Sequence, residues 1–117
     1  ILEATIASVS DIPLAARAII QSGAKAIIVS ADNLAATGFG AIHKAAQNAE
    51  IPVYTTDVDL VDKGAAGAVG DSYYEWGLES GKLAVRIIAG IPPGKLPVMA
   101  TQVHHRIEPA DRYNSRP

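Results

Sequence analysis

The sequence has 117 residues and a formal net charge of −2, and 49% of its residues are hydrophobic while 19% are charged. This length fits a single domain, and the apolar fraction excludes a disordered chain because it is enough to form a core. Ten basic against twelve acidic residues, with no basic stripe, argue against nucleic acid as a partner, and the absence of cysteine excludes a disulfide scaffold and a cysteine nucleophile.

The first part of the chain predicts a strand, a helix and a second strand. Residues 2–7 alternate apolar and polar side chains, which is typical of a strand. The serines and aspartate that follow, with Pro13 in the first turn, favour a helix that ends at Gly23. Residues 25–30 (KAIIVS) form a short continuous apolar run, as expected for a strand that is buried on both faces.

The middle of the chain predicts another helix and two further strands. Apolar residues recur at alternating spacings of four and three over residues 35–49, which predicts an amphipathic helix. Residues 51–56 (IPVYTT) follow as a strand and residues 59–64 as one helical turn. Residues 65–70 (AAGAVG) form a strand of small side chains.

The last part predicts a long helix and a short strand. Asp71 or Ser72 caps a helix that continues to about residue 89, where glycine and two prolines end it. Residues 103–107 alternate again and indicate a final strand. Strands that are separated by helices predict an α/β fold, in which a mostly parallel sheet has helices on both faces.

Polar residues follow three successive strands of the predicted sheet. Asp32 and Asn33 come after residues 25–30, Asp57 after residues 51–56, and Asp71 after residues 65–70. Ligands bind at the carboxyl ends of the strands in open α/β sheets, so we predict these four as ligand-binding residues. Tyr73 joins them, because an aromatic ring at a helix start can stack on a ligand. The alternatives are that the acidic residues only cap turns and helices, and that Tyr73 only covers the core.

The same carboxylates could form a magnesium-dependent acidic site, although the lysine or phosphate-binding loop that usually accompanies such a site is not evident. Residues 77–82 (GLESGK) have the wrong spacing for a phosphate-binding loop. His104 and His105 are neighbours in a predicted strand and therefore point to opposite faces. We predict no catalytic residue, no metal site and no cofactor.

Four stretches resemble the ABC-transporter substrate-binding family of the tryptophan/tyrosine-binding type. They are residues 30–33 (SADN), 51–64 (IPVYTTDVDLVDKG), 65–81 (AAGAVGDSYYEWGLESG) and 84–97 (AVRIIAGIPPGKLP). The resemblance covers nearly everything from Ile1 to about Val98. It implies a periplasmic-binding-protein fold of the first type, in which two α/β lobes close on a ligand. Related sugar binders contact their ligands after the same strands, which here means Asp32, Asn33, Asp57 and Asp71.

The resemblance also implies a domain organisation. Residues 1–100 correspond to the C-terminal ligand-binding lobe without its first strand and helix, and residues 101–117 diverge from the family's usual ending. Ile1 opens directly into a strand pattern, so we expect that processing or truncation removed what preceded it. A missing strand between residues 2–7 and 25–30 would leave backbone groups unpaired, so we expect the fragment to self-associate, to exchange elements or to depend on further sequence.

The sequence is therefore interpreted as the solute-binding component of an ABC importer and not as an enzyme. Its expected partners are a small polar solute, such as an amino acid, and the ABC permease in the membrane. Its expected location is the periplasm or another extracytoplasmic space, with or without a lipid anchor in the part that precedes Ile1. Two alternatives stay open: the ligand-sensing core of a transcriptional regulator, and an α/β enzyme with an acidic metal site.

Overall fold

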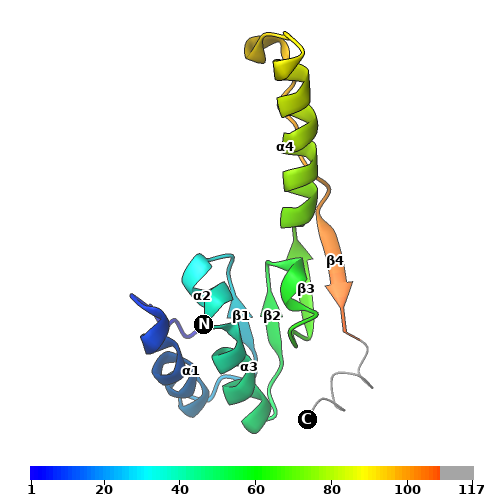
Figure 1. Ribbon diagram of the computed structural model, residues 1–117. Helices are drawn as coiled ribbons and strands as arrows, with labels where there is room; N and C mark the ends of the chain where they lie inside the picture. The colour runs from blue at the N-terminus through cyan, green and yellow to red at the C-terminus, as the bar shows by residue number, and fades with distance from the viewer. Residues whose placement is uncertain (109–117) are drawn as a thin grey trace.

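A four-stranded sheet organises the computed structural model, which describes residues 1–108. The elements in chain order are η1 (Val9–Asp11), α1 (Ile12–Gln21), β1 (Ile27–Val29), α2 (Asn33–Thr37), α3 (Phe39–Asn48), β2 (Val53–Thr55), η2 (Val58–Leu60), β3 (Gly67–Gly70), α4 (Tyr73–Ile88), η3 (Pro93–Lys95) and β4 (His104–Ile107). The strand order is β1-β2-β3-β4, with the first three parallel and β4 antiparallel to β3 (Figure 1). The predicted α/β fold with a mostly parallel sheet is confirmed, and so is the final strand.

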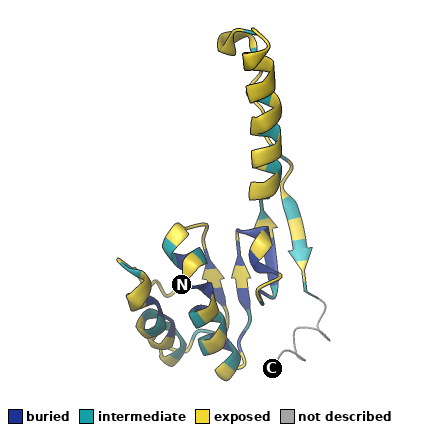
Figure 2. Cartoon of the chain, viewed as in Figure 1, coloured by how far each residue is buried: buried dark blue, intermediate teal, exposed yellow. Residues whose placement is uncertain are grey.

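The core lies between one face of the sheet and helices α1 and α3. Strands β1 and β2 alternate buried and exposed side chains, so their buried residues all face these helices. The helices present apolar side chains at spacings of three and four, which form one stripe toward the sheet. The largest side chains of this core are Phe39, Ile12, Leu60, Val53 and Val61. Figure 2 shows the buried residues gathered in this layer.

The opposite face of the sheet is bare within residues 1–108. Ile28, Tyr54 and Val69 lie on it and are exposed, and Ile28 pairs directly with Tyr54 across the two strands. The 16-residue helix α4 does not cover this face, because it extends away from the carboxyl end of β3 (Figure 1). The sequence predicted helices on both faces of the sheet, but within residues 1–108 helices cover only one face.

Residues 2–7 form no strand, which corrects the prediction made from their alternation. Among the strands of residues 1–108, β1 has only β2 as a neighbour, and a cavity of about 260 Å³ lies beside β1. Ala4 and Ile6 line that cavity together with residues of α1 and β1. An alternating pattern gives a segment strand propensity, but a strand needs a hydrogen-bonding partner, and this segment has none within reach in residues 1–108.

The helix predicted over residues 35–49 is divided into α2 and α3, which corrects a second expectation. Gly38 separates them, and Ile12 of α1 packs so closely on it that a Cβ at Gly38 would lie 2.2 Å from the Ile12 Cδ1 atom. The apolar spacing continues across this break, so the pattern could not reveal it. Within residues 1–108, no helix has both the length and the apolar character that a membrane span requires.

Candidate functional site

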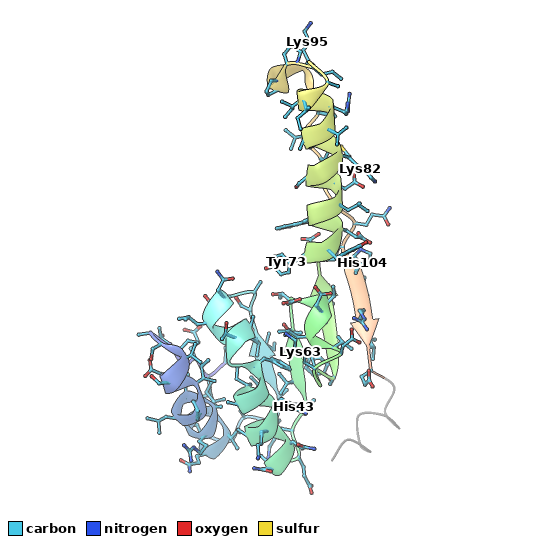
Figure 3. All side chains as sticks on the ribbon, in the orientation of Figure 1. His43, Lys63, Tyr73, Lys82, Lys95 and His104 are labelled. Atoms are coloured by element: carbon cyan, nitrogen blue, oxygen red, sulfur yellow. The ribbon has the colours of Figure 1, made fainter. Side chains whose placement is uncertain are left out.

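A small cavity of about 50 Å³ lies where β1 and β2 end. Its lining residues are Ser30, Ala31, Asp32, Asn33, Ala36, Asp57, Leu60 and Tyr73. Four of the five predicted ligand-binding residues are among them. Parallel strands place their carboxyl ends at one edge of a sheet, which brings together the loops after β1 and β2. Tyr73 reaches the cavity from the base of α4 (Figure 3).

Asp32 caps helix α2 and stands at the mouth of this cavity. Its Oδ1 atom accepts hydrogen bonds from the backbone N–H groups of Leu34, at 2.8 Å, and Ala35, at 3.0 Å. The sequence left helix capping as the alternative to ligand binding, and the Oδ1 atom of Asp32 does cap the helix. Oδ2 accepts no hydrogen bond from residues 1–108, and the side chain is exposed, so this oxygen is available to a ligand. Asn33 is exposed beside it, at the first position of α2.

Asp57 is the buried member of the set, with 9% of its surface exposed. Its Oδ1 atom accepts a hydrogen bond from the Asp59 backbone N–H at 3.0 Å and so caps η2. Its own backbone N–H donates to the Thr55 hydroxyl at 3.1 Å. These bonds hold the carboxylate in place, while its Oδ2 atom accepts none from the described residues. Oδ2 is not among the fully buried polar atoms that lack a partner, so solvent or a ligand donor can reach it.

Asp71 does not line this cavity, although it follows β3 at the same edge of the sheet. Its Oδ1 atom accepts a hydrogen bond from the Thr101 hydroxyl at 2.9 Å. The same hydroxyl oxygen accepts a bond from the Trp76 indole N–H. Ser72, rather than Asp71, caps α4. Asp71 therefore ties the start of α4 to the segment that returns from it, and it borders a separate pocket with Trp76 and Met99.

A second contact joins the same two segments. The Nε2 atom of His104 lies 2.8 Å from the Glu75 Oε2 atom, and the pair is an ion pair only when the imidazole is protonated. Figure 3 shows His104 beside the base of α4. His105 points the other way and is exposed, so the prediction that the two histidines face opposite sides is confirmed. Among residues 1–108, no three His, Cys, Asp or Glu side chains are close enough to hold a metal ion.

Tyr73 lines the cavity and packs against Trp76, which lines the neighbouring pocket. The rings of Tyr73 and Trp76 meet edge to face, with centroids 5.6 Å apart and an interplanar angle of 75°. Both side chains are exposed, so Tyr73 does not cover the core as the alternative interpretation had it. The exposed ring of Tyr73 offers a surface on which the apolar part of a ligand can pack.

Several lining residues were not predicted. Ser30 follows β1 directly, and its position alone could have indicated it. Ala36 and Leu60 line the cavity from α2 and η2 and carry no sequence signal of a site, because small and apolar side chains are common everywhere. Thr101 lies 30 positions from Asp71 in the chain, and only the path of the returning segment brings the two together.

Comparison with known proteins identifies the family. The model of the family described as ABC transporter substrate binding protein matches residues 1–107. The chain belongs to this family. A tyrosine-binding protein of Clostridioides difficile (strain R20291) is 29% identical over 72 residues, which are 62% of this chain and 21% of that protein.

Two solved structures are similar to this substrate-binding family member in fold as well as in sequence. A conserved domain protein from Vibrio cholerae is 29% identical, with a TM-score of 0.78 over 91% of this chain and 36% of that one. An ABC domain from Streptococcus pneumoniae, solved in complex with L-Trp, is 27% identical, with a TM-score of 0.68 over 80% of this chain and 31% of that one. The resemblance and the fold that the sequence predicted are thereby confirmed. The chain spans between 21% and 36% of the length of these three proteins.

Proposed function

We propose that this chain forms one wall of a solute-binding site, which binds a small polar ligand such as an amino acid and leaves it chemically unchanged. The observation that carries this proposal is the cavity shared by Asp32, Asn33, Asp57 and Tyr73. Membership of a substrate-binding family supports the role of binding rather than catalysis.

The chemistry of the cavity suits a ligand with an ammonium group and an apolar part. The two Oδ2 atoms of Asp32 and Asp57 are acceptors, and a charged donor makes the stronger hydrogen bonds. The Asn33 amide can donate to a ligand carboxylate and can also accept from an amine. The Tyr73 ring supplies the apolar contact. Asp71 is left out of the proposed contacts because it borders the neighbouring pocket and does not line this cavity.

The cavity is too small to enclose such a ligand alone. Small-molecule sites measure roughly 300–1,000 Å³, whereas this cavity measures about 50 Å³. We therefore place the ligand between this wall and a second lobe that closes over it. In this proposal the loaded protein delivers its solute to an ABC permease from the periplasmic or extracytoplasmic side of the membrane.

Aromatic L-amino acids are the first candidates for the ligand. One relative is named a tyrosine-binding protein and one solved neighbour was crystallised with L-Trp. The Tyr73 ring, which lines the cavity, offers an aromatic side chain a face on which to pack.

Ligand-detected NMR with the 117-residue chain tests this ligand class. L-tryptophan and L-tyrosine should give saturation-transfer signals, and N-acetyl-L-tryptophan, which lacks the ammonium group, should give much weaker ones. Equal signals from N-acetyl-L-tryptophan would contradict the role given to the two carboxylates. Signals from ribose or glucose alone would contradict the amino-acid assignment.

A further inference from the structure

Helices α1 and α3 lie side by side over the core, and a groove of about 460 Å³ runs between them (Figure 1). Its floor is apolar and consists of Pro13 and Ile20 from α1, with Ala41, Ala45 and Ala49 from α3. These five residues are partly buried, since they also close the core from above. The short alanine side chains leave room above them, so that another helix can approach α3 closely.

The two rims of this groove carry the same kinds of side chain in the same order. Arg17 and Lys44 are each the sixth residue of a ten-residue helix, and Gln21 and Asn48 are each the tenth. The two helices run in the same direction, because each leads into one of two parallel strands that pair directly. The two cations therefore stand at about the same level on opposite rims, and the two amides follow about two-thirds of the way along the groove toward its end.

The positive charges of this groove are not neutralised within the part of the chain that the structure describes. Arg17 and Lys44 are exposed, and neither forms an ion pair with an acidic side chain of residues 1–108. The Arg17 Nε atom donates to the Pro13 carbonyl at 3.1 Å, which leaves the two terminal amino groups of the guanidinium for another acceptor. No acidic residue lines the groove. Carboxylates placed between the rims would therefore be attracted from both sides.

The shape of the groove favours a helix of a partner protein over a lipid surface. Lipid-binding segments carry clusters of roughly four to eight basic residues, whereas this groove has two, and the chain has a formal net charge of −2. A helix packs by placing a ridge of side chains into a groove. Ten helical residues span about 15 Å, so the groove accommodates two to three turns of such a partner.

We propose that the groove between α1 and α3 docks an acidic amphipathic helix of a partner protein. The apolar ridge of that helix rests on the alanine floor, and an aspartate or glutamate on each of its flanks pairs with Arg17 on one rim and Lys44 on the other. The contact is small and its charges are exposed, so the affinity is low and falls as salt is added. The groove shares no lining residue with the candidate ligand site, so docking does not require a ligand.

Fluorescence anisotropy of the 117-residue chain with two labelled helical peptides tests this proposal. Both peptides have the same ridge of leucine and alanine, and one carries glutamate on both flanks where the other carries lysine. The glutamate peptide should bind at least about tenfold more tightly than the lysine peptide, and added salt should weaken its binding. A chain that binds neither peptide, or both equally, would overturn the proposal.

Two double variants with the same net charge test the location of the contact. Arg17→Glu with Lys44→Glu reverses both rims and should weaken binding of the glutamate peptide by about tenfold or more. Lys63→Glu with Lys95→Glu makes the same change of charge at exposed positions outside the groove, and it should leave binding nearly unchanged. Circular dichroism checks that both variants remain folded. Equal losses in the two would overturn the proposal, because the attraction would then come from overall charge. Binding to phosphatidylglycerol vesicles in place of the glutamate peptide would show a lipid surface as the partner and overturn it as well.

Discussion

Gly70 lies against the backbone of Thr56, so that a Cβ atom on Gly70 would lie 1.8 Å from the Thr56 carbonyl oxygen and 2.8 Å from its carbon. This approach brings the end of β3 close to the end of β2, one residue before Asp57. The obstacle is backbone rather than a flexible side chain, so it cannot rotate out of the way. Only glycine fits at this point beside the candidate site.

Replacing Gly70 by alanine should therefore destabilise the fold. We expect Gly70→Ala to lower the free energy of unfolding by about 1–3 kcal/mol, because the strands must separate to admit the methyl group. Gly40→Ala is the matched control, since a Cβ there would meet no atom within 4 Å and the residue lies in helix α3. It should stabilise the chain by up to about 1 kcal/mol. Urea denaturation measures both, and equal effects would show that the close approach is not formed.

The layer of α1 and α3 on the sheet should carry most of the stability. Phe39 is 1% exposed within this layer, and Phe39→Ala should cost about 3–5 kcal/mol through lost burial and a residual cavity. Ile28, on the bare face, is 77% exposed, and Ile28→Ala should change stability by less than about 0.5 kcal/mol. Thermal unfolding of the two variants checks this contrast, and a large loss from Ile28→Ala would mean that this face is covered in solution.

Asp57 has two roles that substitutions can separate. Asp57→Ala removes the cap of η2 and should cost about 1 kcal/mol of stability. Asp57→Asn keeps an oxygen for the Asp59 backbone N–H but removes the charge, so it should be nearly neutral for folding. Both changes should weaken ligand binding, by roughly 1.5–3 kcal/mol for a charged hydrogen bond.

His105→Ala is the control for these binding measurements, because His105 is exposed on β4 and away from the cavity. It should leave the affinity nearly unchanged in calorimetric titrations. An Asp57→Asn variant that binds as well as the unmodified chain would remove Asp57 from the site.

Arg106 joins β4 to the segment around η2. Its guanidinium makes two hydrogen bonds to the Asp62 carboxylate, at 2.7 and 3.2 Å, and one to the Val58 carbonyl at 3.1 Å. The bond to Asp62 raises the pKa of Arg106 above its ordinary value. Because the pKa of Arg106 is raised on folding, the stability that the pair contributes is complete below the pKa of the unfolded state. It is lost only as the pH rises through the pKa of the folded state. The contribution should therefore be constant from neutral to moderately alkaline pH.

Arg106→Gln should cost at most about 1 kcal/mol, because both side chains are exposed and the ion pair is screened. The loss should be the same at neutral and moderately alkaline pH and smaller at high salt. Urea denaturation under these conditions measures it. A loss that grows with salt would contradict an electrostatic origin.

The sequence predicted those parts of the fold that local physics determines. Ser72 caps α4, and Gly23, with a φ of 90°, follows the end of α1, as their residue types indicate. Residues 2–7 were predicted wrongly because their alternation is a local property, whereas a strand depends on a neighbour elsewhere in the sheet. The break at Gly38 was missed for the same reason, since it depends on the contact with Ile12 of another helix.

The residues of the candidate site could be predicted where the topology of the sheet alone determines which residues meet. Asp32, Asn33 and Asp57 follow parallel strands, so the sheet brings them together whatever their other contacts are. Asp71 follows a parallel strand as well, but it lines a different pocket, where its carboxylate accepts a hydrogen bond from the Thr101 hydroxyl. That contact depends on the path of the chain after α4, for which the sequence offers no local signal.

A chemical-shift map of the ¹⁵N-labelled chain, titrated with L-tryptophan, tests the proposed site most directly. One wall of a site makes only part of the contacts but still bears most of the entropic cost of holding the ligand, so binding should be weak. The signals should therefore shift gradually with ligand concentration. We predict that the largest changes occur at the backbone amides of Asp32, Asn33, Asp57 and Tyr73, and that Asp57→Asn reduces them. Changes centred on the cavity beside Ala4 and Ile6, or on the pocket of Trp76 and Met99, would contradict the account.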